Sequence, residues 1–382
     1  MFSTRLAWNT GINRISEAVR LRREAGGEIL DLTGSDPARA GLLHSPQALE
    51  DAFRHPRLNT YEPSPQGSLE ARQAVCSYYE GRGRRVCPER ILLTASTSES
   101  YAWLLKLLAD PGDEILVPRP SYPLFEFLAA LESVRVVQYP LLYHDRWQID
   151  FGALEALVTP RTRALFVVNP NNPTGSFLKR GEWPRLCRLQ LPVVCDEVFS
   201  DFALAPDDAR LESLAGDDGE LLAFSLSGLS KVCGMPQMKL GWMVVSGPER
   251  DRSEALRRLE LIADTYLSVG TPVQLAAPHL LALRSSFQEP LKQRLRANLQ
   301  MLRAAPFRLL DVEGGWYATI RVPRIRTEEE WVLHLLGRGV LAQPGFFYDF
   351  EGEAYLVLSL LTPPDVFAAG CARIIGEGDC EW

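Results

Sequence analysis

An α/β fold, with a mostly parallel sheet in a large domain followed by a smaller α+β domain, is the class that the sequence predicts. Short apolar runs alternate with helical stretches from about residue 90 to residue 246, a pattern typical of a parallel sheet covered on both faces. The pattern changes after Gly247, where one long helical stretch is followed by paired strands. A chain of 382 residues also exceeds one compact core, so two domains are expected.

The elements of the first part follow one another in regular order. Residues 91–94 are expected to form a strand, and residues 98–109 an apolar-periodic helix that Asp-Pro-Gly-Asp at 110–113 terminates. Further strands are expected at 115–117, 164–168, 193–195, 222–226 and 243–245.

The second part has a different pattern of predicted helices and strands. Residues 249–267 form one long helical stretch, rich in Leu, Arg and Glu, which we expect to link the domains. Two strands are expected within 307–322, around Gly314 and Gly315. Thr327 and Glu330 have the spacing of a capping box that opens an amphipathic helix. A strand at 356–361 and a final helix at 366–375 complete this part.

Composition excludes several classes of protein. The net charge of −7 argues against general nucleic-acid binding, and no run of about 18 apolar residues predicts a membrane span. The first residues lack the pattern of a secretory signal, and the five histidines have no metal-ligand spacing. An odd number of scattered cysteines indicates reduced thiols in the cytoplasm rather than a disulfide framework. They are Cys76, Cys87, Cys187, Cys195, Cys233, Cys371 and Cys380.

Three segments combine apolar runs with reactive side chains. Asn-Pro-Asn-Asn-Pro-Thr-Gly at 169–175 is an amide-rich turn, Asp196 ends an apolar run, and Lys231 ends Ser-Leu-Ser-Gly-Leu-Ser-Lys at 225–231. A single loop lysine is usually a solvated surface residue, and a single Asn-Pro turn is only a turn. In combination, an amine can form an imine with an aldehyde cofactor, and a carboxylate can hold a pyridine nitrogen protonated. The set therefore favours a pyridoxal-phosphate enzyme.

The order of these segments, followed by Lys-Leu-Gly-Trp at 239–242, resembles the class I/II aminotransferases of pyridoxal-phosphate (PLP) fold type I. The resemblance extends from about Leu30 to about Ile375. It implies a mostly parallel, seven-stranded sheet in the large domain, with the strand at 243–245 antiparallel. The implied divisions are an N-terminal segment at 1–45 that joins the small domain, a large PLP-binding domain at 46–265 and a small domain at 266–382.

The resemblance also implies roles for individual residues. Lys231 would form the imine and act as the base that moves a proton from the substrate Cα, and Asp196 would face the pyridine nitrogen. Tyr61 would reach the phosphate from the neighbouring subunit, which implies a homodimer. The other implied cofactor contacts are Asn172 to the 3′ oxygen, Tyr122 stacked on the ring, and Ser96, Thr97, Ser98 and Ser230 at the phosphate.

Three positions depart from the family pattern. Phe199 stands where most relatives carry a tyrosine that donates to the cofactor's 3′ oxygen, and Lys239 replaces a phosphate-binding arginine. Val357 occupies the place of an arginine that clamps the substrate α-carboxylate. Ser35 and Arg39, in the N-terminal segment, are the substitute candidates for substrate contact, although Arg39 also fits an ordinary surface arginine.

The expected function is transfer of an amino group between an amino acid or amine and a keto acid. The alternative is a PLP-dependent lyase or decarboxylase on the same scaffold, because one carbanion serves all these reactions. A non-enzymatic regulator is disfavoured because Lys231 and Asp196 are both intact. The expected partners are a small-molecule amino donor and a keto acid acceptor.

Overall fold

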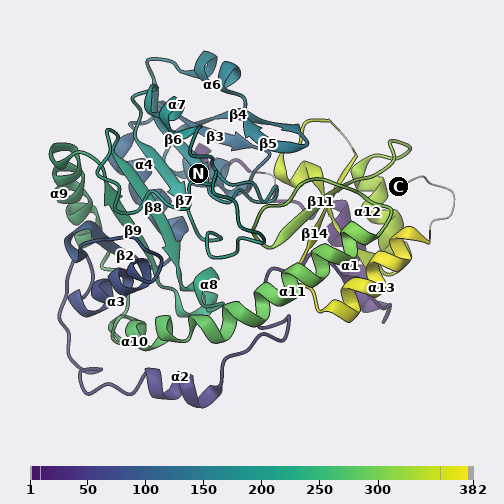
Figure 1. Ribbon diagram of the computed structural model, residues 1–382, viewed down its shortest axis with the longest axis horizontal. Coiled ribbons are helices and arrows are strands. Elements are labelled where there is room, and N and C mark those ends of the chain that lie inside the picture. The colour runs from purple at the N-terminus through teal and green to yellow at the C-terminus, as the bar shows by residue number, and fades with distance from the viewer. Residues whose placement is uncertain (1, 9, 353, 377–382) are drawn as a thin grey trace.

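Residues 2–8, 10–352 and 354–376 are described by the computed structural model of this chain. The two larger sheets organise the molecule, one formed by the blue to teal strands and a smaller one formed by the yellow-green strands (Figure 1). The long helix α11 (Arg284–Ala304) runs from α10 (Thr271–Ala282) toward the small sheet.

Eight strands of the described chain form the large sheet, in the order β2-β9-β8-β7-β6-β3-β4-β5. The inner strands run parallel from β8 to β4, whereas β9 pairs antiparallel with both β2 and β8, as the resemblance implied. The strands are β2 (Ile91–Thr94), β3 (Glu114–Arg119), β4 (Arg135–His144), β5 (Arg146–Ile149), β6 (Thr162–Val168), β7 (Val193–Asp196), β8 (Ala223–Gly228) and β9 (Gly241–Ser246).

Both faces of this sheet are covered, as its near-continuous apolar strands require. Alternate side chains point to opposite faces, so Val194 packs in the layer beneath α4 (Thr97–Leu108) and α9 (Glu249–Tyr266), while Val193 packs on the other side. On that other side, α3 (Leu69–Glu80) and α10 pack together over β2 and β9. The predicted α/β class is therefore confirmed.

The small sheet is antiparallel, in the order β10-β11-β14-β13. The N-terminal segment joins this part of the molecule, because Leu30 and Asp31 pair in parallel with Val340 and Leu341. The strands of the small sheet are β10 (Arg308–Leu309), β11 (Tyr317–Arg321), β13 (Gln343–Pro344) and β14 (Tyr355–Ser359), and β1 (Leu30–Asp31) and β12 (Val340–Leu341) form a separate two-stranded sheet. The predicted capping box at Thr327 and Glu330 is present at the start of α12 (Glu328–Gly337).

The remaining helices connect the strands and pack against the sheets or against one another. The α-helices are α1 (Arg14–Glu24), α2 (Pro46–Ala52), α5 (Leu124–Leu131), α6 (Phe151–Leu157), α7 (Trp183–Cys187), α8 (Leu229–Val232) and α13 (Pro364–Ile375). Short 3-10 helices are η1 (Thr4–Leu6), η2 (Pro88–Arg90), η3 (Pro236–Met238) and η4 (Gly345–Tyr348). Among the described helices, none is both long and apolar enough to cross a membrane.

Three features differ from the sequence-based expectations. Strands β4 and β5 were not located, because β4 has mostly half-buried or exposed residues and β5 extends the sheet edge as its hairpin partner. The edge strand β5 brings the sheet to eight strands instead of the implied seven. The helix expected to link the domains, α9, packs on α4 and β9 of the large domain, and α11 instead leads to the small sheet.

Candidate active site

A cavity lies at the carboxyl ends of parallel strands β6, β7 and β8, the edge where ligands bind in such sheets. We call it the carboxyl-edge cavity; its volume is about 180 Å³. Its lining comprises Ser35, Thr97, Ser98, Tyr101, Tyr122, Leu124, Phe125, Val168, Asn172, Asp196, Val198, Phe199, Ser230, Lys231 and Tyr317. The fold therefore brings together most of the predicted site residues, from segments far apart in the sequence.

Lys231 lies in α8, directly after β8, and its amine enters the cavity beside aromatic rings. The Nζ atom is 4.7 Å from the centroid of the Trp316 ring and 5.4 Å from that of Phe199. Burial lowers the pKa of Lys231 to about 8, although the charges of Asp196 and Asp36 oppose the shift. The amine can therefore hold or release a proton near neutral pH.

Asp196 is the last residue of β7, and each of its carboxylate oxygens accepts a hydrogen bond. The Val198 N–H donates to Oδ1 at 3.0 Å, and the Tyr101 hydroxyl donates to Oδ2 at 2.6 Å. Burial raises the pKa of Asp196, while these two donors and the Lys231 charge act to lower it. The side chain is thus a buried acid placed beside a half-buried base.

Asn172 differs from the other asparagines of its turn. Asn169 and Asn171 are committed to the fold: Asn169 accepts from the Leu178 N–H at 2.9 Å, and Asn171 donates to the carbonyl of Pro120 at 3.0 Å. The Oδ1 atom of Asn172 is buried without a hydrogen-bond partner among the described residues, although Asn172 lines the cavity. An orphaned buried polar atom indicates that a bound group completes this site.

The serine-rich loop after β2 divides into structural and cavity-lining residues. Ser96 is the N-cap of α4, and its hydroxyl accepts from the Glu99 N–H at 3.2 Å. Thr97 and Ser98, in the first turn, line the cavity together with Ser230. Hydroxyl groups and free N–H groups at a helix N-terminus suit an anion such as phosphate.

Four of the proposed contacts lie outside the lining. Lys239 is exposed and has a left-handed backbone with φ of 50°. Tyr61 is 76% exposed and lines a separate hollow beside Trp103 and Ser268. The Arg39 side chain is 90% exposed and pairs with Asp36 at 3.6 Å. Ser96, as the N-cap, is the fourth.

Val357 is fully buried in the small sheet, where it pairs with Thr319 and Gln343. It therefore contributes to the small-domain core, and it is not part of the cavity lining. Lys231 is the sole cation among the described residues that line the carboxyl-edge cavity.

Sequence reasoning missed three aromatic residues at the site. Tyr101 was assigned only to an apolar-periodic helix, and Trp316 and Tyr317 only to strands. The hydroxyl of Tyr317 interacts with Ser35, and burial raises the pKa of Tyr317 to about 12. The position of Trp316 directly after Gly314-Gly315 was the available signal, because small residues permit a close approach of the chain.

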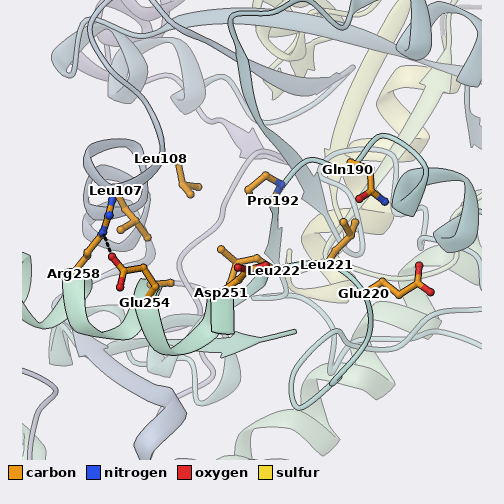
Figure 2. A pocket seen from close by; sticks show the side chains of 11 residues that line it. Leu107, Leu108, Gln190, Pro192, Glu220, Leu221, Leu222, Asp251, Glu254 and Arg258 are labelled. Carbon is orange, nitrogen blue, oxygen red and sulfur yellow. Dashed lines mark hydrogen bonds and ion pairs between the residues drawn. The ribbon is translucent and has the colours of Figure 1, made fainter. Parts of the chain in front are cut away.

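A larger hollow lies at the opposite edge of the sheet, at the amino ends of β7 and β8 (Figure 2). We call it the amino-edge hollow; its volume is about 350 Å³. Its charged side chains include Arg258, which donates to Glu254 at 2.7 Å within α9. It is lined by Leu107, Leu108, Gln190, Pro192, Glu220, Leu221, Leu222, Asp251, Glu254, Ala255 and Arg258, none of which belongs to the predicted motifs.

Comparison with known proteins assigns the chain to a family. Residues 27–366 match the family described as "Aminotransferase class I and II". The chain is 32% identical to the glutamate-pyruvate aminotransferase AlaA of Escherichia coli (strain K12) over 281 residues, which cover 72% of this chain and 68% of that protein. It is also 32% identical to the tyrosine aminotransferase of Bos taurus, over 95% of this chain and 85% of that protein.

Solved structures share the fold over the whole chain. The alanine aminotransferase of Pyrococcus furiosus superposes with a TM-score of 0.86, at 25% identity and 98% coverage of each chain. An aminotransferase of Escherichia coli has a TM-score of 0.85 at 24% identity, covering 100% of this chain and 99% of that one.

Proposed function

The chain belongs to the aminotransferase class I and II family, and we propose that its carboxyl-edge cavity binds pyridoxal 5′-phosphate, the cofactor on which this family depends. The protein is an aminotransferase, which moves an amino group between an amino acid or amine and a keto acid. The observation that carries the cofactor proposal is that Lys231 and Asp196 line one cavity together with Asn172, whose buried Oδ1 atom has no hydrogen-bond partner among the described residues.

When bound, pyridoxal phosphate supplies an aldehyde to which amines attach and a ring that accepts electrons from the bond being broken. Lys231 would attach the cofactor, because its amine lines the cavity and is partly unprotonated near neutral pH. Once a substrate amine has displaced it, the Nζ atom would accept the proton from the substrate Cα and return it.

The other lining residues would hold and orient the cofactor. Asp196 would face the ring nitrogen with a negative charge, and the ring of Tyr122 would stack on the pyridine. Asn172 would bind the 3′ oxygen, beside the apolar edge of Phe199. Thr97, Ser98 and Ser230 would donate to the phosphate at the N-terminus of α4, whose first N–H groups have no partner within the helix.

Two further contacts would come from outside the cavity lining. Ser96 would support the phosphate loop as its N-cap. Lys239 would contribute positive charge near the phosphate, as a single-point donor rather than the bidentate fork of an arginine. Because Lys239 is exposed, we expect its contribution to phosphate binding to be weak.

The homodimer is part of the same proposal. Tyr61 is 76% exposed on a loop, so its hydroxyl is available to a second copy of the chain rather than to its own cavity. Light scattering would measure the mass in solution. A Tyr61→Phe variant that binds pyridoxal phosphate as tightly as the unaltered dimer would argue against the contact across subunits.

The cysteines bear on the proposed location of the protein in the cell. The six described cysteines are free thiols, which favours a reducing compartment such as the cytoplasm. Cys380 lies outside the described residues.

The proposed domains are residues 1–45 with 266–382, around the small sheet, and 46–265, around the large one. Because α10 packs on α3 of the large domain, limited proteolysis should place the boundary nearer the start of α11.

Borohydride reduction of the cofactor-loaded protein tests the central assignment. Peptide mapping should find the pyridoxyl adduct on Lys231, the only lining amine among the described residues. An adduct on Lys239 would overturn the roles of both lysines. Release of a keto product, without ammonia or carbon dioxide, would distinguish amino transfer from lyase or decarboxylase chemistry on the same cavity.

A further inference from the structure

We propose that Tyr101 is a positioning residue for the reaction, which keeps Asp196 ionised toward the cofactor's ring nitrogen through a hydrogen bond to Oδ2. The inference rests on the proposed function, in which Asp196 faces the ring nitrogen of pyridoxal phosphate. It concerns a residue outside the motifs that identified the site.

The geometry places Tyr101 directly behind the carboxylate. Tyr101 lies in the second turn of α4, only 5% exposed, and its hydroxyl donates to Asp196 Oδ2 at 2.6 Å. The backbone of Val198 donates to the other oxygen at 3.0 Å. The Tyr101 hydroxyl is therefore the side-chain donor of this pair, and the one that a conservative substitution can remove.

Aromatic packing fixes the direction of that hydroxyl. The Tyr101 ring stacks on Phe166 of β6, with centroids 5.8 Å apart and planes 24° apart. Phe125 of α5 meets the same ring edge-on, with centroids 5.4 Å apart and planes 80° apart. Both contacts hold the ring between two elements, so the donor is preorganised before any ligand binds.

Few other titratable groups lie near the Asp196 carboxylate. Titratable neighbours of Asp196 are Cys195 and Glu197 on its own strand end, Tyr122 before α5, and Lys231 in α8. The described cavity lining contains no arginine or histidine that would pair with Asp196. Lys231 is also the base of the proposed reaction, so its charge changes during turnover, whereas the Tyr101 donor is permanent.

A hydrogen bond from a neutral hydroxyl distinguishes between the two states of a carboxylic acid. A donor stabilises an ionised acceptor by more than a neutral one. The Tyr101 hydroxyl therefore favours the arrangement in which the carboxylate is ionised and the proton resides on the ring nitrogen. Without it, the proton shifts toward the carboxylate, and the ring becomes a weaker electron acceptor.

The test compares two ligands of the apoprotein that differ only at the ring nitrogen. These are pyridoxal 5′-phosphate and 1-deazapyridoxal 5′-phosphate, in which a C–H group replaces the nitrogen. The ratio of their dissociation constants measures the preference for the nitrogen. Tyr101→Phe should reduce this preference by about five- to tenfold, the difference between a charged and a neutral hydrogen-bond acceptor.

Tyr78→Phe is the matched control. Tyr78 of α3 is also buried, and its hydroxyl donates at 3.2 Å to both oxygens of a different carboxylate, that of Asp201. This variant should retain the unaltered preference. In an Asp196→Asn background, Tyr101→Phe should have no further effect on the preference, because the ionisable partner is gone.

A purely structural role for Tyr101 would weaken both ligands by the same factor and leave the preference unchanged, and that result would overturn the inference. Should Tyr101→Phe fail to fold, 3-fluorotyrosine incorporated at position 101 preserves the packing and strengthens the donor. The preference should then increase, and an unchanged preference would reject the idea. Failure of the proposed function itself looks different, because the unaltered protein would then not bind pyridoxal phosphate saturably, or would not prefer it to the deaza analogue.

Discussion

The carboxyl-edge cavity and the amino-edge hollow lie at opposite ends of the same strands, β7 and β8. The hollow is the larger, at about 350 Å³ against about 180 Å³. Its charged groups are solvent-facing side chains of α9 and of the loop before β8, including an Arg258–Glu254 pair whose side chains are 63% and 43% exposed. Exposed pairs of this kind contribute little to stability.

The smaller cavity has the opposite character. Its acid, Asp196, is buried and its base, Lys231, is half-buried, and desolvation moves the pKa of Asp196 upward and that of Lys231 downward. Opposed shifts in one cavity are typical of functional sites. In this fold, therefore, the chemistry of the lining, and not the volume of the space, distinguishes the candidate active site from the other hollow.

Removal of the cavity's amine should have the largest effect of any single change. Lys231→Ala should reduce amino transfer by at least about 10²- to 10⁴-fold, because a general base and the point of cofactor attachment are both lost. Glu254→Gln, in the amino-edge hollow, should leave kcat/KM unchanged. Steady-state kinetics with a donor found by screening would measure both, and a reversed result would assign the chemistry to the wrong end of the strands.

The substrate end of the cavity provides the second test. Val357 stands where the resemblance implies a carboxylate-binding arginine, and no arginine is among the described residues that line the cavity. Aspartate, glutamate and alanine should therefore be poor donors, by about 30- to several-thousand-fold, the equivalent of roughly 2–5 kcal/mol for a buried bidentate pair. Val357→Arg should improve turnover of a simple amino acid, provided that the fully buried strand position accepts the larger side chain.

Arg39→Ala in the otherwise unaltered protein is the control for that test. The Arg39 side chain is 90% exposed, so the expected effect is none. If the unaltered protein uses glutamate or alanine efficiently and Arg39→Ala abolishes this use, the carboxylate contact has moved to Arg39. If simple amino acids are good donors in both proteins, the contact lies elsewhere, for example on a second copy of the chain.

The depressed pKa of Lys231 also predicts that the stability of the folded apoprotein depends on pH. Below about pH 8 the amine is charged in both states, so the folded protein bears its full desolvation cost. Between about pH 8 and pH 10.5, the ordinary pKa of lysine, only the unfolded state remains protonated. The desolvation cost to the folded state therefore decreases over this range, and it is absent above pH 10.5. Denaturation of apo Lys231→Met and the unaltered apoprotein should therefore differ by a margin that shrinks by about 1–3 kcal/mol over this range. A margin independent of pH would show that the amine is solvated.

Much of the site could be predicted because its main residues sit at strand ends. Asp196 ends β7 and Lys231 follows β8, so the alternation of strands and helices already directs both to one edge of the sheet. Motif order then predicted Asn172, which lines the same cavity. The same reasoning located six strands of the large sheet, whose residues are almost all buried, but not β4, whose half-exposed residues lack a clear pattern.

Contacts between distant segments could not be predicted in this way. Periodicity indicates that Tyr101 is buried, but not that its hydroxyl reaches a carboxylate on β7. Trp316 approaches Lys231 from the small domain, and that approach depends on how the two sheets pack. Lys239 matches a motif but is exposed, since a motif specifies the residue type and not the conformation of its side chain.

The smallest expected effect concerns Phe199, which lines the carboxyl-edge cavity at a position where the resemblance implies a tyrosine. Phe199 is 4% exposed, with its ring edge-on to Trp316 at a centroid distance of 5.2 Å. A hydroxyl added by Phe199→Tyr should donate to the cofactor's 3′ oxygen and stabilise its ionised form. One neutral hydrogen bond contributes about 1 kcal/mol, and one pKa unit corresponds to about 1.4 kcal/mol. The pH midpoint of the bound cofactor's absorption change should therefore fall by somewhat less than one unit.

Phe199→Leu, which changes the packing without adding a donor, is the control and should not lower this midpoint. A midpoint that stays or rises in the tyrosine variant would mean that position 199 does not reach the 3′ oxygen.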